Sequence, residues 1–179
     1  MINSNVGSRK GGAIDYATSF KGLRISEITL ENKLPTINIV ESGGVNLPDQ
    51  DRVFNNAGAS FREISKRSKA GLPTISVVFG NATAGGAYVP GMSDFSIFQK
   101  QVAKVFLAGP PLVKMATNEI SSAEELGGAS MHSRVSGVSD YLAENELDGI
   151  RIAREIMEIV NTSQPHMVPS DRIQPPQYS

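Results

Sequence analysis

The sequence LPTINIVESGG, residues 34–44, has a second version further along the chain, LPTISVVFGNATAGG, residues 72–86. Each begins with Leu-Pro-Thr-Ile, continues in a β-branched run typical of a buried strand and ends in a pair of glycines. Residues 54–70, which lie between them, carry apolar side chains at helical spacing. A helix that connects two buried strands favours parallel pairing, so we expect an α/β fold with a largely parallel sheet.

The rest of the chain predicts two more strands, three more helices and a loop at the start. The apolar runs at residues 95–98 and 102–107 lie too close together for a helix between them, which favours units of two strands and a helix. Residues 1–12 are polar and interrupted by glycine, and they predict a loop. The helices are expected at residues 20–32, from Pro110 onward and at residues 144–160.

A third glycine pair, Gly127 and Gly128, follows the second at the interval of 42 residues that also separates the first two. Ser121 and Glu124 just before it have the spacing of a capping box and predict a short helix. We expect the glycine pair to end that helix in the left-handed conformation. The interval then reflects the length of a supersecondary unit, because the sequences around the pairs otherwise differ.

Composition describes a globular chain and excludes several classes of function. The 179 residues are 40% hydrophobic with a net charge of −1, so a basic field for nucleic acid is absent. The sequence has no cysteine, which excludes disulfides, cysteine-ligated zinc and a thiol nucleophile. It shows neither a signal peptide nor an apolar run of membrane length, so we expect a cytoplasmic protein, or one of the mitochondrial matrix in a eukaryote.

Backbone N–H groups at Gly85 and Gly86 are the strongest candidates for a functional site. Small residues lead from the end of the second strand into Ala87 and Tyr88, where a helix can begin. The N–H groups at its positive end suit an anion or a developing enolate oxygen. Such a turn can also be a close strand-to-helix connection without a ligand. The loop at residues 42–44 favours the ligand, because adjacent parallel strands point both loops into one crevice.

Side chains that usually carry catalysis give little signal. A nucleophile elbow fails because Val40 replaces its first glycine, and a phosphate loop fails because Gly86 and Ala87 stand where lysine and serine are needed. His132 is interpreted as a structural hydrogen-bonding residue, and His166 lies in the tail. We expect no metal site. Four lysines can meet the phosphates of a nucleotide-like ligand or simply remain solvated: Lys10, Lys21, Lys104 and Lys114.

Four stretches carry a specific combination of motifs: VESGGVNLP at 40–48, TAGGAYVP at 83–90, FLAGPPLVKMAT at 106–117 and LGGASMHSRVSGVSD at 126–140. Together they resemble the carboxyltransferase (β) subunits of biotin-dependent acyl-CoA carboxylases, in the branch that acts on propionyl-CoA, methylcrotonyl-CoA and longer chains. The resemblance covers nearly everything from Lys10 to Val160 in order. It implies a crotonase-like fold, a superhelix of strand-strand-helix repeats.

The resemblance also implies the reaction and the residues that take part in it. Members of this family move a carboxyl group from carboxybiotin to the α or γ carbon of an acyl-CoA. The biotin nitrogen can itself take the α-proton, so the site needs charge stabilisation and positioning more than a side-chain base. The implied oxyanion donors are the N–H groups of Gly85 and Gly86. Gly43 and Gly44 are the implied neighbours that line the same pocket. We further expect these residues to bind the substrate: Ser42, Ala84, Ala87, Tyr88, Lys10 and Lys114.

Family subunits are much longer than this chain, with a second crotonase-like half that holds biotin. We therefore interpret residues 1–161 as a first-half domain, shortened at its start, and the proline-rich residues 162–179 as a linker toward an absent second half. The implied partners are that second half, a biotin carboxylase with its biotin carrier, and further copies of full-length subunits. Two alternatives stay open: a biotin-dependent acyl-CoA decarboxylase subunit, and a non-catalytic acyl-CoA-binding or assembly module.

Overall fold

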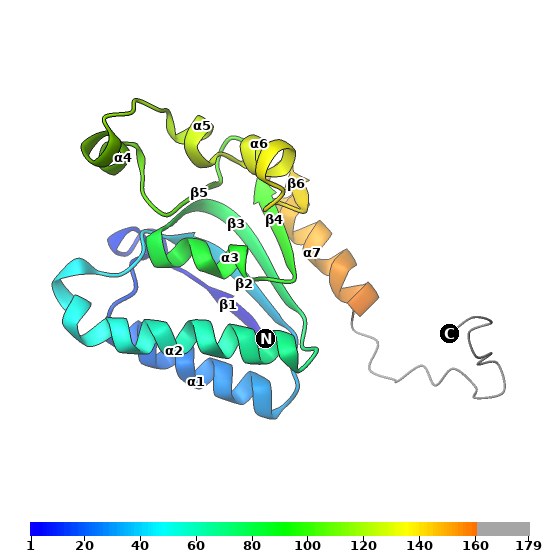
Figure 1. Cartoon of the computed structure of the whole chain (residues 1–179). Helices are drawn as coiled ribbons and strands as arrows, with labels where there is room; N and C mark the ends of the chain where they lie inside the picture. Colours follow the sequence, from blue (N-terminus) through cyan, green and yellow to red (C-terminus); the bar gives the residue numbers. More distant parts are fainter. Residues whose placement is uncertain (161–179) are drawn as a thin grey trace, which may run out of the picture.

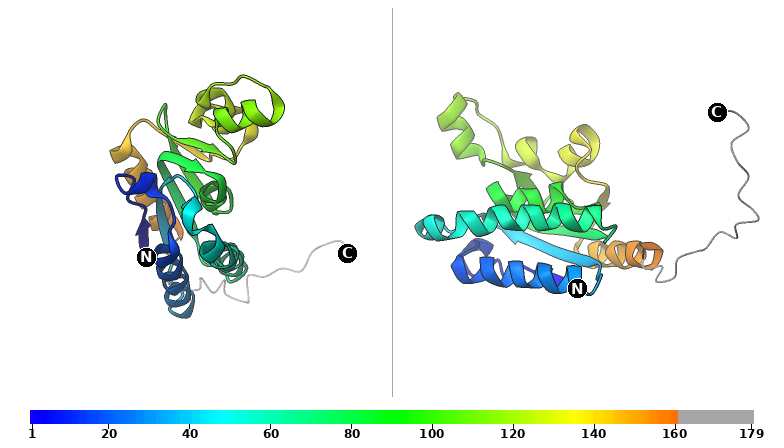
Figure 2. Two further views of the ribbon diagram at one scale, coloured as in Figure 1. Left: turned by 90° about the vertical axis from the view of Figure 1, so that its left-hand side faces the viewer. Right: turned by 60° about the horizontal axis from the view of Figure 1, so that its bottom comes forward.

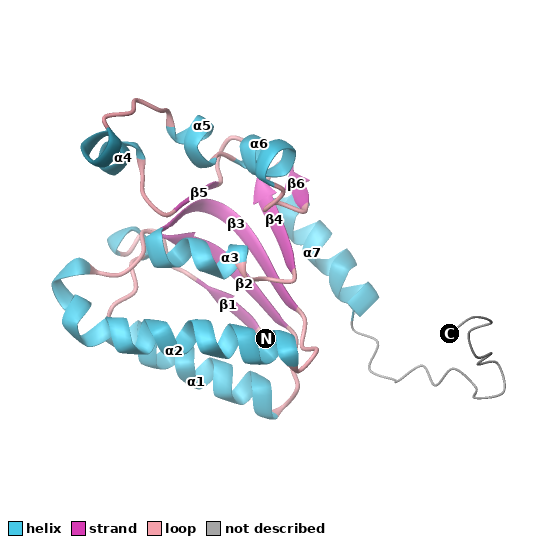
Figure 3. Cartoon of the chain, in the orientation of Figure 1, coloured by secondary structure: helices cyan, strands magenta, loops and turns pink. Residues whose placement is uncertain are grey.

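The computed structural model describes residues 1–160. Strands and helices alternate for most of the chain, as Figures 1 and 3 show. The first half contains β1 (Ile2–Ser4), η1 (Lys10–Gly12), α1 (Tyr16–Glu31), β2 (Thr36–Ser42), η2 (Leu47–Asp49), α2 (Gln50–Lys69), β3 (Thr74–Thr83), η3 (Ala84–Ala87) and α3 (Tyr88–Gly91). The second half contains β4 (Phe95–Gln99), β5 (Lys104–Phe106), α4 (Pro110–Thr117), α5 (Ala123–Gly127), α6 (Ala129–Met131), η4 (His132–Ser136), β6 (Tyr141–Ala143) and α7 (Glu146–Val160).

Six strands form one sheet in the order β1-β2-β3-β4-β6, with β5 paired to the far end of β3. Every strand pair is parallel. The register sets Thr36 opposite Thr74 and Ser42 opposite Ala82, with an irregularity after Val40. The first part of β3 pairs with β4 and its last part, from Asn81, pairs with β5, so this long strand bends from one partner to the other. The ends of β2 and β3 are thereby fixed side by side.

The main sequence predictions about the sheet are confirmed. The two Leu-Pro-Thr-Ile segments open neighbouring parallel strands, and no helix separates β4 from β5. The second β-branched run becomes β3, which extends to Thr83 because its last residues gain β5 as a partner. The prediction of a loop for residues 1–12 is wrong at Ile2–Ser4, where three exposed residues pair with β2. Their strand depends on that pairing, since they bury no side chain of their own.

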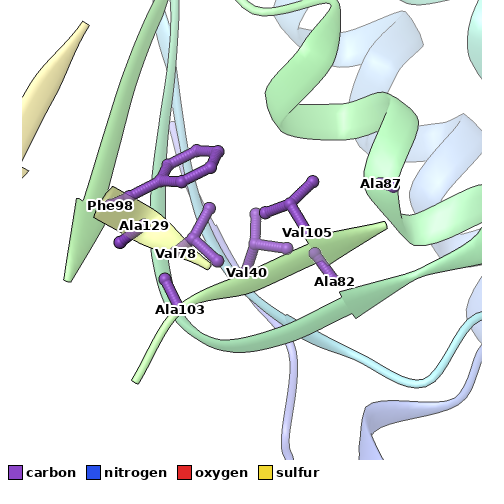
Figure 4. Packing of buried hydrophobic residues seen from close by; sticks show 8 residues of the cluster. All are labelled: Val40, Val78, Ala82, Ala87, Phe98, Ala103, Val105 and Ala129. Atoms are coloured by element: carbon purple, nitrogen blue, oxygen red, sulfur yellow. The ribbon is translucent and has the colours of Figure 1, made fainter. Parts of the chain in front are cut away.

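Two hydrophobic clusters fill the two faces of the sheet because side chains alternate along each strand. On one face Ile75 and Val77 pack with Ile97 and with the buried face of α7. On the other face Val78 packs with Val40 and Phe98, with Val105 of β5, and with alanines from β3, η3, the turn before β5 and α6; Figure 4 shows this cluster closely. The two further views place α7 and α2 on opposite sides of the sheet (Figure 2). The longest strands are therefore covered on both faces, as parallel sheets require.

Helix boundaries differ from the predicted ones where side-chain caps decide them. Helix α1 begins four residues earlier than expected because the Asp15 carboxylate accepts the N–H of Thr18. Helix α7 begins at Glu146, two residues late, since the Asn145 side chain caps the N–H of Asp148 at 3.0 Å. The capping box before the third glycine pair is formed by Ser122 and Glu125, so the predicted pairing of Ser121 with Glu124 is wrong by one residue.

The third glycine pair does not end its helix in the left-handed conformation, because Gly128 has a φ of −71°. Its glycines are needed for close packing. A side chain at Gly127 would overlap the carbonyl O of Val105 in β5, and one at Gly128 would overlap Glu124. An ion pair of 2.6 Å between Lys104 of β5 and Glu124 of α5 also joins these two elements. The segment from α4 to α6 is thus held against the end of the sheet that lies away from α1 and α2 (Figures 1 and 2).

Candidate functional site

The loops after β2 and β3 meet at the carboxyl edge of the sheet, as the sequence predicted. A Cβ placed on Gly86 would lie 3.0 Å from both the Cβ and the Oγ of Ser42. A Cβ placed on Gly44 would lie 3.0 Å from the carbonyl O of Thr83 and 3.4 Å from the Cβ of Ala84. The structure therefore brings the two predicted glycine loops together. A side chain at Gly86 would require Ser42 to shift, and one at Gly44 would in addition be strained by the left-handed φ of 89°.

A sharp turn joins β3 to its helix, and the backbone N–H of Gly85 lies at this turn. Thr83 is extended, Ala84 has a left-handed φ of 52°, and the 3-10 helix η3 runs directly into α3. In 3-10 geometry each N–H reaches the carbonyl three residues back, so Gly86 is the first donor that the helix itself uses. Within residues 1–160 the N–H of Gly85 has no hydrogen-bond partner outside this helix. Gly85 thus presents a backbone donor at a positive helix end.

The first glycine pair has a different role, because its own N–H groups are already bonded. Gly43 donates to the carbonyl O of Gly11 at 2.8 Å, and Gly44 donates to the Oγ of Ser42 at 3.2 Å. The carbonyl of Gly44 accepts the N–H of Ile14 at 2.8 Å. Gly43 and Gly44 therefore fix the loop and permit close approach to the second glycine turn, while Gly85 supplies the unpaired donor.

Residues 11–14 hold the first loop in place, a role that the sequence did not predict. Gly11 and Gly12 both have a left-handed φ, and a side chain at Gly12 would overlap the carbonyl O of Glu41. The available signal was a fourth adjacent glycine pair in the segment RKGG. Only glycine fits where two backbones approach this closely.

The other predicted binding residues lie in several parts of the fold. Ser42 is buried between the loops, Ala84 is exposed, and Ala87 is buried in the core. The exposed ring of Tyr88 packs on Phe61 of α2 with 4.9 Å between ring centroids. Lys10 is exposed and precedes the glycine that bonds the first loop. Lys114 is exposed on α4, in the part of the chain beyond β5.

His132 is held by its surroundings, in agreement with its interpretation as a structural residue. Its Nε2 lies 2.7 Å from the carbonyl O of Val105, which requires Nε2 to donate, and its Nδ1 lies 2.7 Å from the Oγ of Ser136. Both ring nitrogens are therefore occupied. His166 and the proposed linker at 162–179 lie outside the described residues. Among residues 1–160 no group of three His, Asp or Glu side chains is arranged to hold a metal ion.

Comparison with known families gives a match over residues 1–178 to the carboxyl transferase domain. The chain belongs to this family. A probable biotin-dependent acyl-coenzyme A carboxylase β2 subunit of Mycobacterium tuberculosis is 55% identical over 161 residues, which are 90% of this chain and 30% of that subunit. A mitochondrial methylcrotonoyl-CoA carboxylase β chain of Arabidopsis thaliana is 48% identical over 88% of this chain and 27% of its own length.

Solved structures of carboxyltransferase-family members have the same fold. The β subunit of geranyl-CoA carboxylase from P. aeruginosa superposes with a TM-score of 0.83 and 44% identity, over 88% of this chain and 30% of the other. Transcarboxylase 12S, solved as a hexamer with methylmalonyl-coenzyme A bound, gives a TM-score of 0.81 at 28% identity over 87% and 31%. The crotonase-like fold is thereby confirmed. The chain spans about a third of the length of these carboxyltransferase-family relatives. None of the helices among residues 1–160 is long and apolar enough to cross a bilayer.

Proposed function

We propose that this chain is the acyl-CoA-binding part of a biotin-dependent acyl-CoA carboxyltransferase, with Gly85 and Gly86 as the oxyanion donors for the thioester. The observation that carries the proposal is the unpaired N–H of Gly85 at the start of η3, in a family of carboxyltransferases. The Gly86 N–H lies at the same helix end and is the second donor, since N–H groups at helix ends often share two acceptors.

The residues of the site act by binding and by stabilising charge. When the carbon next to the thioester loses its proton, negative charge develops on the thioester oxygen, and a donor already aimed at that oxygen lowers the barrier by roughly 3 kcal/mol. Ser42 packs against Gly86, and Gly44 packs against Thr83 and Ala84, so the loop after β2 supports the turn. Lys10 and Lys114 are proposed to meet the phosphates of CoA, and Ala84, Ala87 and Tyr88 to line the path of the thioester.

The carboxyl group comes from carboxybiotin on a separate carrier, and biotin supplies the nitrogen base after carbon dioxide is released. The donors described here suit one carbonyl oxygen, because Gly43 and Gly44 are engaged and Gly127 and Gly128 are packed against β5 and Glu124. We therefore assign the biotin ring to a second carboxyltransferase half. The complete enzyme would need that half, a biotin carboxylase with its carrier, and further full-length copies, in the cytoplasm or the mitochondrial matrix.

The test is to observe the backbone donors directly during binding. Acyl-CoA is titrated into nitrogen-15-labelled chain, and the amide proton resonances are followed by NMR. We expect the Gly85 and Gly86 amides to move downfield and to saturate with the same dissociation constant as calorimetry gives. The amides of Gly43 and Gly44 are the internal control, because they lie in the other loop and donate to Gly11 and Ser42.

Two results would contradict the proposal. In the first, acyl-CoA binds while the Gly85 and Gly86 amides stay unchanged and resonances elsewhere move, so the thioester lies at another place. In the second, no CoA thioester binds at millimolar concentration, which favours an assembly module over a substrate-binding domain.

A further inference from the structure

One side chain of α2, that of Phe61, lies against the second glycine turn. A Cβ placed on Gly85 would lie 3.9 Å from the Cζ of Phe61, and within residues 1–160 this is the only atom beyond the turn itself that comes within 4 Å. The same ring packs against Tyr88, with 4.9 Å between the ring centroids and 41° between the ring planes. Phe61 therefore contacts both the start of η3 and the residue that follows it, where α2 and α3 are neighbours (Figure 1).

The turn depends on such contacts, because its backbone is not stable by itself. The helices η3 and α3 have four residues each, which is far below the length at which a helix persists without tertiary support. Ala84 has a left-handed φ of 52°, which is unfavourable for a residue with a Cβ. Backbone of this kind persists only where its surroundings fix it. The loop after β2 supports the turn through Ser42 and Gly44, and Phe61 supports it from α2.

The phenyl ring also leaves the N–H of Gly85 free for a ligand. It has no lone pair that accepts a strong hydrogen bond, whereas a hydroxyl, amide or carboxylate in its place would compete with the ligand for the donor. The half-buried ring keeps water away from one side of the amide, and a hydrogen bond is electrostatically stronger where water is excluded. An apolar ring at this position thus favours both the direction and the strength of a hydrogen bond from Gly85.

We propose that Phe61 is a positioning residue for the oxyanion donor: its ring holds η3 and Tyr88 so that the N–H of Gly85 points at the thioester oxygen. The proposal rests on the proposed function, since it assumes that a thioester binds at Gly85. Phe61 acts through Gly85 and Tyr88 and does not touch the reacting atoms. Its removal should therefore weaken the hydrogen bond to the thioester and leave the attachment of CoA itself unchanged.

The experiment compares butyryl-CoA with CoA, which lacks the thioester carbonyl. Each is titrated into the nitrogen-15-labelled full chain, and the amide resonances are followed by NMR. In Phe61→Ala we expect butyryl-CoA to bind roughly three- to tenfold more weakly, which corresponds to the loss of one aromatic contact, and CoA to bind as in the unaltered chain. The downfield movement of the Gly85 amide at saturation, taken as bound minus free within each variant, should fall to about half or less.

Phe61→Met and Phe54→Ala are the matched controls. Methionine keeps a long apolar side chain with only a weak acceptor, so Phe61→Met should retain most of the affinity and of the amide movement. Phe54→Ala removes the same ring from an exposed position on the same helix, and both ligands should bind to it as before. Urea unfolding shows that each variant is folded. If Phe61→Ala does not fold, Phe61→Leu replaces it, with the same direction expected for every effect.

Equal losses for butyryl-CoA and CoA in Phe61→Ala would mean that the site has loosened as a whole, and they would overturn the positioning role. Unchanged butyryl-CoA binding would overturn it as well, as would a Phe61→Met chain that behaves like Phe61→Ala. The proposed function would survive each of these results as long as the Gly85 amide of the unaltered chain responds to butyryl-CoA. If that amide does not respond, or if no thioester binds, the proposed function fails and the positioning role fails with it.

Discussion

Gly86 and Ser42 pack closely across two neighbouring strand ends. Because a Cβ on Gly86 would lie 3.0 Å from both the Cβ and the Oγ of Ser42, Gly86→Ala requires Ser42 to shift by a few tenths of an ångström. We expect it to lower the free energy of unfolding by about 1–3 kcal/mol, as overpacking generally does. It should also weaken acyl-CoA binding, because the donor turn moves. Urea denaturation and calorimetry measure the two effects.

The contact itself is tested by removing the other side chain. In the double variant Ser42→Gly/Gly86→Ala, removal of the Ser42 side chain leaves space for the new methyl group. The double variant should therefore lose less free energy of unfolding than the two single variants lose in sum. Additive losses would mean that Gly86→Ala acts through some other contact.

Much of the fold could be predicted because its signals are local. The β-branched runs of β2 and β3 each begin with Leu-Pro-Thr-Ile, and they are neighbours in the sheet. Asn118 ends α4 with a φ of 61°, a left-handed conformation that asparagine tolerates better than most residues. Strand β1 was missed because it bears no apolar alternation and exists only through pairing with β2.

The meeting of the two glycine loops could be predicted from the sequence, but the hydrogen bonding of their N–H groups could not. Glycine pairs mark places where backbones approach, but the sequence does not show which N–H groups remain free. The amide of Gly43 is taken by Gly11, more than 30 positions earlier in the chain. Contacts of this kind depend on tertiary packing, so only the structure separates Gly85 as an unpaired donor from Gly43 and Gly44 as loop-forming residues.

The third glycine pair is predicted to be essential for folding and unrelated to chemistry. Gly127→Ala would force a methyl group into the backbone of β5, and we expect it to cost about 3 kcal/mol or more. Gly58→Ala is the control, since this glycine lies inside α2 with free space and should gain about 0.5–1 kcal/mol from higher helix propensity. Thermal and urea unfolding of both variants decide the matter, and equal stabilities would contradict the packing argument.

Arg67 is a buried cation that joins three elements of the first half. Its guanidinium group donates to the hydroxyls of Thr29 and Thr36 and, at 3.1 Å, to the carbonyl O of Leu34. Burial lowers the pKa of Arg67, while the Asp94 carboxylate acts in the opposite direction. Arg67→Met keeps the length of the side chain but leaves these acceptors unpaired.

We expect Arg67→Met to lower the free energy of unfolding by about 3 kcal/mol, because each buried group left unpaired costs about 1–3 kcal/mol. Lys69→Met, on the exposed side of the same helix, should change it by less than about 0.5 kcal/mol. Denaturant titrations of the two variants give the comparison. Similar losses in both would show that charge on α2 matters more than the buried hydrogen bonds.

Acid should weaken the chain through carboxylates that cap its helices, and Asp15 is the clearest case. The hydrogen bond from the Thr18 hydroxyl is the main cause that holds the pKa of Asp15 below its ordinary value of 3.8, and the hydrogen bond from the Thr18 backbone N–H is the second. The unfolded chain therefore binds this proton more readily than the folded one, so stability rises with pH across the interval between the two pKa values. The contribution of Asp15 to stability is complete above the unfolded pKa and is lost as pH falls through the folded pKa.

In Asp15→Asn the amide oxygen still caps α1 but does not titrate, so the fall in stability from about pH 5 to about pH 2 should become shallower. Urea midpoints measured across that range test this, and a slope identical to that of the unaltered chain would show that other carboxylates cause the acid loss.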